Sequence, residues 1–249
     1  MTKKNIFWFS PFVVMGIVLL FATGCKKSNS TTSPAPAGGT VTDIDGNVYH
    51  TVTIGTQVWL VENLQVTHYR NGDPIIAGSL KADGKLLTDT TGKVYAYNNS
   101  SENAKVYGRL YNWYALGSAH TIAPNGCHVP SDAEWYALSA YLSTKYGTAT
   151  IPDYGGIGSV LKEAGTTHWQ TPNTGATNES GFTALPGGSF AYGVFGGLGA
   201  QCFFWTSTQV GTGTNQPAAW SVNLAFDGII AHRVNPIKQY GISVRCLKD

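Results

Sequence analysis

The segment GCHVPSDAEWYAL, Gly126–Leu138, contains the clearest signal for local structure in this chain of 249 residues. Ser131 is followed three positions later by Glu134, the spacing at which a serine N-cap and a glutamate each accept a hydrogen bond from the other's backbone N–H. Apolar side chains then recur at the three- and four-residue spacing of one helical face: Trp135, Leu138, Tyr141 and Leu142. We therefore expect a capped amphipathic helix in which Glu134 is structural.

Around this helix the sequence predicts short strands. Residues 47–54 are rich in β-branched and aromatic side chains, Gly55-Thr56 supplies a two-residue turn, and residues 57–60 return, so a β-hairpin is expected. A second helix is expected over Leu110–Ala119 from its apolar spacing. Further strands are expected over residues 93–97, 203–208, 219–225, 228–234 and 242–246. Two main helices among many short, twisted strands predict the α+β class.

Composition limits the protein class. Hydrophobic residues make up 43% of the chain and charged residues only 12%, which does not fit an intrinsically disordered protein. From Val41 onward there are 12 basic and 14 acidic residues, without a run of adjacent Lys or Arg. We therefore do not expect this protein to bind nucleic acid. No second linker interrupts residues 41–249, which we expect to form one domain.

The beginning of the chain predicts a location. Lys3 and Lys4 precede an almost wholly apolar stretch, Ile6–Ala22, that is typical of a secretory signal. It ends in Ala22-Thr23-Gly24-Cys25, which resembles a bacterial lipobox. We expect a signal peptide over residues 1–24, acylation of Cys25, and attachment to the lipid bilayer of the outer membrane or cell envelope. The alternative is an uncleaved membrane anchor.

Residues 25–40 contain no large apolar side chain after Cys25 and are rich in Ser, Thr, Pro and Gly. Such a segment cannot bury enough surface to fold, so it is expected to be a flexible tether. Whether the domain faces the periplasm or the cell surface stays open, because Lys26 and Lys27 are not the acidic pair that often directs such lipoproteins outward.

Seven strings, in order along the chain, carry a family resemblance: DIDGNVYHTVTIGTQVWLVENL (43–64), YGRLYNWYAL (107–116), GCHVPSDAEWYAL (126–138), LKEAGTTHW (161–169), TGATNESGFTALPGG (174–188), FWTSTQ (204–209) and YGISVRCLKD (240–249). They resemble the Fibrobacter succinogenes major paralogous domain, which is typical of envelope lipoproteins and whose biochemical role is unassigned. The order of elements is also similar to C-type lectin-like domains, and HVPSDAEW is similar to a helix start in formylglycine-generating enzymes. The resemblance implies a lectin-like fold but only an analogy for function.

The lectin-like resemblance also implies a disulfide. With Cys25 acylated, three cysteines remain, and the Cys near the first helix of such folds pairs with one on the last strand, here Cys127 with Cys246. Cys202 would then be a free thiol. The alternative is three reduced, buried thiols.

Catalysis is not expected. No nucleophile elbow, metalloprotease helix or CxxC pair occurs, and the six His residues are scattered singly without metal-ligand spacing. Glu134, Glu163 and Glu179 are conceivable acids for glycoside hydrolysis, but nothing in the sequence brings two of them together. Asp43–Asn47 superficially resembles the start of a calcium loop, although Val48 and Ile54 stand where that loop needs Gly and Glu. We expect no catalytic residue, no metal and no cofactor.

Binding without catalysis is the remaining interpretation. Trp169 and Trp205 lie among Thr, Asn and Gly and are the predicted ligand-contacting aromatics, with core packing as the alternative. Gly187–Gly199 is expected to be a mobile loop over such a site or a set of tight turns. The expected function is a lipid-anchored binding module for a polysaccharide or another envelope protein. The alternatives are an enzyme of formylglycine-generating-like fold with an unrecognised site and a purely structural envelope protein.

Overall fold

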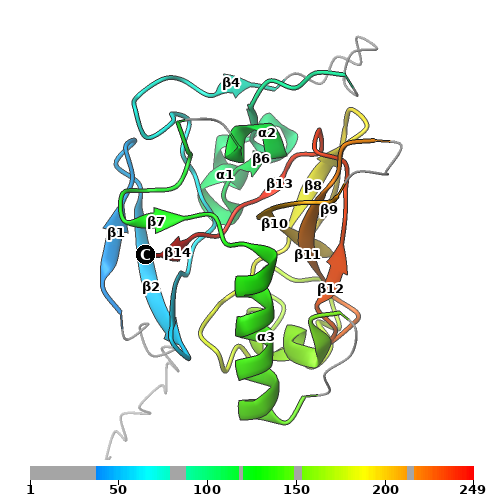
Figure 1. Cartoon of the computed structure of the whole chain (residues 1–249). Helices are drawn as coiled ribbons and strands as arrows, with labels where there is room; N and C mark the ends of the chain where they lie inside the picture. Colours follow the sequence, from blue (N-terminus) through cyan, green and yellow to red (C-terminus); the bar gives the residue numbers. More distant parts are fainter. Residues whose placement is uncertain (1–37, 79–87, 118–119, 149–152, 212–215) are drawn as a thin grey trace, which may run out of the picture. The chain divides into compact units, whose positions relative to one another are not determined.

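The computed structural model describes residues 38–78, 88–117, 120–148, 153–211 and 216–249. The expected signal peptide (1–24), Cys25 and all but the end of the tether lie outside these ranges. Within them, no helix has both the length and the apolar character that a membrane crossing needs. The folded region belongs to the α+β class, with more strand than helix (Figure 1).

The first sheet contains five strands and includes the predicted hairpin. In spatial order they are β1 (Thr40–Thr42), β2 (Val48–Ile54), β3 (Gln57–Leu60), β14 (Leu247–Lys248) and β7 (Cys127–His128). The turn between β2 and β3 places Ile54 opposite Gln57, and Gly55 adopts a φ of +64° that other residues rarely tolerate. The hairpin prediction is confirmed, and strands from both ends of the described chain meet in one sheet.

The second sheet is larger and has β10 near its centre. Its strands are β12 (His232–Val234), β11 (Ala219–Ala225), β10 (Gln201–Gln209), β13 (Ile242–Ser243), β6 (Leu110–Tyr111), β5 (Lys93–Tyr95) and β4 (Ile76–Ala77), with β8 (Gly187–Ala191) and β9 (Val194–Leu198) attached through β10. Strand β10 runs antiparallel to β11 and parallel to β13 and β8. The predicted strand over 228–234 is real only at its end, because Gly228–Ala231 is not in the sheet.

Helix α3 dominates the helical content. The helical elements are η1 (Tyr97–Asn99), α1 (Ser101–Tyr107), α2 (Trp113–Leu116), α3 (Asp132–Tyr146), η2 (Gly155–Ile157) and α4 (Gly158–Leu161). The helix predicted over 110–119 is mostly wrong. Leu110 and Tyr111 pair with β5 and β13, and the Asn112 side chain caps a helix of only four residues by accepting from Ala115 N.

The main aromatic core is formed by side chains from the two sheets and α3. Figure 1 shows how these elements are arranged. Trp59 from the first sheet contacts Trp135 of α3 at 4.8 Å between ring centroids, and Trp135 stacks on Phe204 of β10 at 5.7 Å. Phe182 closes the cluster with edge contacts to all three rings. Burying side chains of this size is the main favourable contribution to the fold.

Arg245 lies inside this core. Its side chain is 1% exposed, and its guanidinium group lies 4.4 Å from the Phe182 ring centroid. It donates to Asn63 Oδ1 at 2.7 and 3.1 Å and to the carbonyl oxygens of Phe182 and Leu60 at 2.6 and 3.2 Å. Burial lowers the pKa of Arg245 to about 10, so it stays charged at neutral pH.

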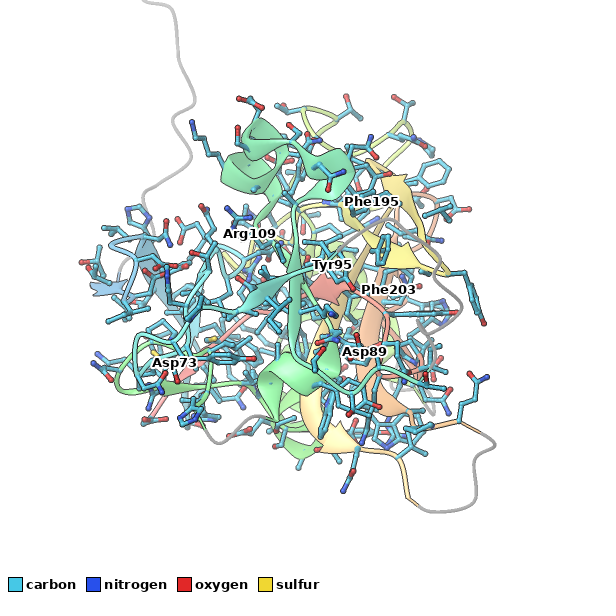
Figure 2. All side chains as sticks on the ribbon, turned by 90° about the horizontal axis from the view of Figure 1, so that it is seen from above. Asp73, Asp89, Tyr95, Arg109, Phe195 and Phe203 are labelled. Carbon is cyan, nitrogen blue, oxygen red and sulfur yellow. The ribbon has the colours of Figure 1, made fainter. Side chains whose placement is uncertain are left out.

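The glycine-rich segment predicted as a loop or a set of turns forms the β8–β9 hairpin instead. Ala191 faces Val194 across a two-residue turn in which Tyr192 and Gly193 have φ values of 51° and 85°. Below it, Tyr95 stacks on Phe190 at 4.4 Å. Figure 2 shows Tyr95 near the middle of the view from above and Phe195 on the hairpin to one side. The hairpin is therefore held by its own small core.

Candidate binding surface

The start of α3 is built by the predicted capping box. Ser131 Oγ accepts from Glu134 N at 3.2 Å, and Ser131 N donates to Glu134 Oε2 at 2.6 Å. Asp132 N donates to Thr208 Oγ1 of β10 at 3.1 Å, which ties the first turn to the second sheet. The prediction that Ser131 and Glu134 cap the helix is confirmed, and the cap positions Asp132 beside β12.

Asp132 holds Arg233 in a two-point ion pair. Arg233 Nε and Nη2 each donate to one Asp132 oxygen at 2.8 Å, and the Tyr154 hydroxyl donates to Asp132 Oδ1. These hydrogen bonds to Asp132 raise the pKa of Arg233, and burial followed by the nearby carboxylate raises the pKa of Tyr154. The carboxylate thus accepts three bonds, and paired contacts of this kind fix both position and plane of a guanidinium group.

The fixed guanidinium group lies over two aromatic rings at the surface. Its central carbon is 3.2 Å from the Trp220 ring centroid and 5.8 Å from that of Tyr136. Arg233 lies opposite Val222 in the β11–β12 ladder, two residues from Trp220. Trp220 is partly exposed and Tyr136 is 41% exposed. We call Tyr136, Trp220 and Arg233 the α3 surface.

The α3 surface combines two partly exposed aromatic rings with a fixed guanidinium group. The aromatic rings offer apolar faces, the indole group of Trp220 offers an N–H donor, and the guanidinium group holds the rings in place. Asp132 is already saturated by Arg233 and Tyr154, so it is not a free base. The arrangement can bind a partner that combines apolar faces with hydroxyl groups, and it carries no nucleophile.

Glu134, the first of the three conceivable acids, is an occupied acceptor. Its Oε1 lies 2.9 Å from His128 Nε2, while its Oε2 accepts from Ser131 N and Oγ. Burial alone would raise the pKa of Glu134, but the hydrogen bonds from Ser131 and His128 lower it. At neutral pH it is a carboxylate and does not serve as a proton donor.

The other two acids lie elsewhere. Glu163 contacts His168 Nδ1 at 2.8 and 2.9 Å, next to α4. Glu179 is exposed, and its backbone carbonyl accepts from the Tyr146 hydroxyl. Glu134, Glu163 and Glu179 each contact different residues, so the structure does not bring the three conceivable acids into one site.

The structure corrects the prediction for Trp169 and Trp205. They are 2% and 0% exposed. Trp169 Nε1 donates to Ala184 O at 2.9 Å, and Trp205 Nε1 donates to Tyr111 O at 2.7 Å. Both rings therefore belong to the core, where the indole N–H of each is satisfied by a backbone carbonyl. The sequence did not single out Tyr136 and Trp220, the two aromatics of the α3 surface. Tyr136 is recognisable as the aromatic that lies off the apolar face of the predicted helix.

The predicted disulfide is wrong. Cys127, Cys202 and Cys246 are free, buried thiols. In the β7–β14 ladder Lys248 lies opposite Cys127, so Cys246 is two residues away from the facing position. Burial raises the pKa of all three thiols, that of Cys202 to about 12. They are protonated and unreactive at neutral pH.

The Asp43–Asn47 segment is a hydrogen-bonded turn. Asp43 Oδ1 accepts from the backbone N–H groups of Asp45 and Asn47, both at 2.9 Å, and Oδ2 accepts from Asn47 Nδ2 and the Tyr49 hydroxyl at 2.8 and 2.6 Å. These donors occupy the carboxylate. Across the described residues, no group of three or more His, Cys, Asp or Glu side chains could hold a metal ion.

A comparison of the sequence with known families places this chain in one of them. The sequence model of the Fibrobacter succinogenes major domain matches residues 52–248, a range that includes α3, Trp220 and Arg233. No curated protein and no solved structure gave a match. Because the match covers most of the chain, this protein belongs to the Fibrobacter succinogenes major domain family.

Proposed function

We propose that this protein is a lipid-anchored envelope protein that binds a neutral polysaccharide, without catalysis, through the α3 surface. The observation that carries the proposal is the position of Arg233, locked by Asp132 and stacked 3.2 Å from the Trp220 ring centroid. A rigid aromatic at a surface binds at low entropic cost, because it is already ordered before the ligand arrives.

The ligand class follows from charge and shape. A sugar ring has an apolar C–H face, which fits an indole or phenol face, and hydroxyl groups, which fit the polar edges beside them. The positive charge of Arg233 is compensated by Asp132, so the surface has no spare charge for an acidic ligand. A neutral polysaccharide therefore fits better than an anionic one.

The non-enzymatic part of the proposal rests on the occupied acids. Glu134 caps α3 and Asp132 holds Arg233. Glycoside hydrolysis needs one carboxyl group free to donate a proton and a second free to attack or to activate water. Neither residue is free for such a step, which supports a binding role.

The envelope location is proposed from the signal-like segment and the lipobox-like Ala22–Cys25. The tether of residues 25–40 would hold the folded domain, 41–249, off the bilayer. Replacing Cys25 by Ser should move the protein from the membrane fraction to the soluble fraction. Retention of the Cys25→Ser chain in membranes would contradict acylation as the anchor.

We also propose that the fold is of the C-type lectin-like kind. Two features support this reading: one long capped helix, α3, and a terminal strand, β14, that returns to the sheet of the first strands. A shared fold would add only an analogy, so the binding proposal depends on the α3 surface itself.

The test is a printed array of neutral and acidic polysaccharides probed with residues 26–249. We expect binding to at least one neutral polysaccharide. The chain offers a matched pair of variants: Tyr136→Ala removes an α3 tyrosine that faces Arg233, whereas Tyr141→Ala removes an α3 tyrosine of equal exposure, 40% against 41%, that does not. Only Tyr136→Ala should weaken binding. Equal loss in both variants, or an array without a hit, would contradict the proposal, and sugar hydrolysis would favour the enzyme alternative.

A second candidate, docking of another envelope protein, is favoured by the β8–β9 turn. Tyr192 and Val194 are each 66% exposed there, and residues 185–201 carry no charge. Exposed apolar side chains without charged neighbours are common at protein interfaces. Crosslinking from position 192 in intact cells would identify such a partner, and a Tyr192→Ser chain should lose it while keeping polysaccharide binding.

A further inference from the structure

His128 differs from every other histidine whose contacts the structure records. Its Nδ1 lies 2.6 Å from Asp249 Oδ1, and its Nε2 lies 2.9 Å from Glu134 Oε1. His50, His68, His168 and His232 each contact carboxylate oxygens through Nδ1 alone. His128 therefore lies between two carboxylates, on β7 and between α3 and the end of β14.

The two carboxylate contacts determine which protonation state of the His128 ring fits this geometry. A neutral imidazole has one N–H donor and one lone pair, whereas an ionised carboxylate only accepts. One of the two contacts of a neutral His128 would bring a lone pair against a carboxylate oxygen, which is repulsive. The imidazolium form has a donor for each carboxylate, so this geometry suits the charged form alone.

We infer that His128 is a proton-dependent clamp: as imidazolium it joins β7, Asp249 beside β14 and the capping box of α3, and on losing its proton it releases one of the two carboxylates. Glu134 is the point of contact with the capping box, because its other oxygen accepts from Ser131. The proposed binding function does not depend on this clamp.

The charges around His128 set the direction of its pH dependence. Burial alone would lower the pKa of His128, but the hydrogen bonds to Asp249 and Glu134, and their charges, raise it above 6.5. Lys248 and Arg70, from β14 and the loop before β4, act on the neighbouring Cys127 and oppose the effect of Asp249 there. A raised pKa in the folded state stabilises the protein fully below pH 6.5, and this stabilisation is lost as the pH rises through the folded value.

Glu134 limits the clamp on the acidic side. Its pKa is lowered from the ordinary 4.5, so its contribution is present above that value and is lost as the pH falls through the lower folded value. The clamp should be complete between about pH 4.5 and 6.5 and should open on the alkaline side.

The test uses the full chain in detergent, with histidine labelled at the ring nitrogens and followed by NMR from pH 5 to 9. We expect both ring nitrogens of His128 to be protonated at pH 6.5 and its titration midpoint to lie above that value. Asp249→Asn should lower the midpoint, because it removes a carboxylate whose hydrogen bond and charge stabilise the imidazolium form, and Asp249 is exposed. Asp153→Asn is the control, since it removes a partly exposed carboxylate from His232 instead, and it should leave the His128 titration unchanged.

A second readout is the denaturation midpoint of the wild type and of His128→Gln at pH 6 and pH 8.5. The denaturation midpoint of the wild type should fall more from pH 6 to pH 8.5 than that of His128→Gln. A singly protonated His128 ring at pH 6.5, or a titration that Asp249→Asn does not move, would overturn the clamp. Neither the His128 titration nor the denaturation midpoint measures polysaccharide binding. Failure of the clamp and failure of the binding proposal are therefore distinguishable.

Discussion

Arg245 and Arg233 both stack on aromatic rings, and they differ in the groups that accept their hydrogen bonds. Arg245 is 1% exposed and donates only to the Asn63 amide and to backbone carbonyls, 4.4 Å from the Phe182 ring centroid. The Arg233 side chain is 23% exposed, is paired with the Asp132 carboxylate and lies 3.2 Å from the Trp220 ring centroid.

The difference separates a contact inside the core from a contact at the surface. In the core, neutral acceptors satisfy the donors of Arg245, and no part of its aromatic partners reaches solvent. At the surface, a carboxylate fixes Arg233 while Trp220 and Tyr136 stay partly exposed. The same stacking contact thus lies inside the core at one site and beside partly exposed rings at the other, where we propose a binding surface. Four variants or treatments test this contrast.

The largest effect should come from Arg245→Met. It leaves Asn63 and two backbone carbonyls without donors inside the core, and each lost partner costs on the order of 1–3 kcal/mol. We expect a loss of about 3–5 kcal/mol in the free energy of unfolding, measured by urea denaturation. A loss below about 1 kcal/mol would show that Arg245 does not organise the core.

Arg233→Met should reduce the free energy of unfolding less than Arg245→Met does, and it should weaken polysaccharide binding more. Its ion pair is partly solvated, so we expect a loss of about 1–2 kcal/mol in the free energy of unfolding. Polysaccharide binding should weaken at least tenfold, because Trp220 loses the group that orients it. If Arg233→Met and Arg245→Met destabilise the chain equally, the contrast between the two sites is wrong.

Ser131→Ala should have a smaller effect on both properties. It removes the acceptor for Glu134 N, an N-cap bond whose loss costs about 1 kcal/mol. Because Asp132 keeps its bond from Arg233, binding should change by less than threefold. Thermal unfolding of Ser131→Ala beside the wild type measures the first effect, and an unchanged melting temperature would contradict a stabilising cap.

The smallest effect should come from a thiol reductant. Cys127, Cys202 and Cys246 are free, so the core is held by packing rather than by a crosslink. Reductant should leave the denaturation midpoint of a Cys25→Ser chain unchanged. A lower midpoint, or peptide mapping that finds a bridge between Cys127 and Cys246, would restore the disulfide.

Local signals in the sequence predicted local structure well. The Ser131–Glu134 cap and the hairpin around Gly55 each depend on residues a few positions apart, and both are present. The helix expected over 110–119 failed because Leu110 and Tyr111 pair with β5, which precedes them, and with β13, which lies far along the chain. Tertiary pairing overrode a spacing that was helical in isolation.

The candidate site could not be predicted from neighbouring residues either, because residues distant in the sequence form it. Arg233 meets Asp132 from 101 residues away, and Trp205 is buried against a carbonyl 94 residues away. The polar residues around Trp169 do not mark it as core, and nothing beside Trp220 marks it as exposed, whereas Trp205 follows Phe203 and Phe204 in a predicted strand. The sequence could supply the aromatic candidates, but only the register of β11 with β12 and their packing on α3 selects among them.

The most direct test of the account is the affinity of Trp220→Ala for the neutral polysaccharide found on the array, measured by calorimetry. Trp220 supplies the ring on which Arg233 stacks, and a central aromatic of this kind typically contributes about 2 kcal/mol or more to binding. We predict binding at least tenfold weaker than that of the wild type, together with a cooperative unfolding transition that shows an intact fold. An affinity equal to the wild type in a folded Trp220→Ala chain would contradict the α3 surface as the binding site.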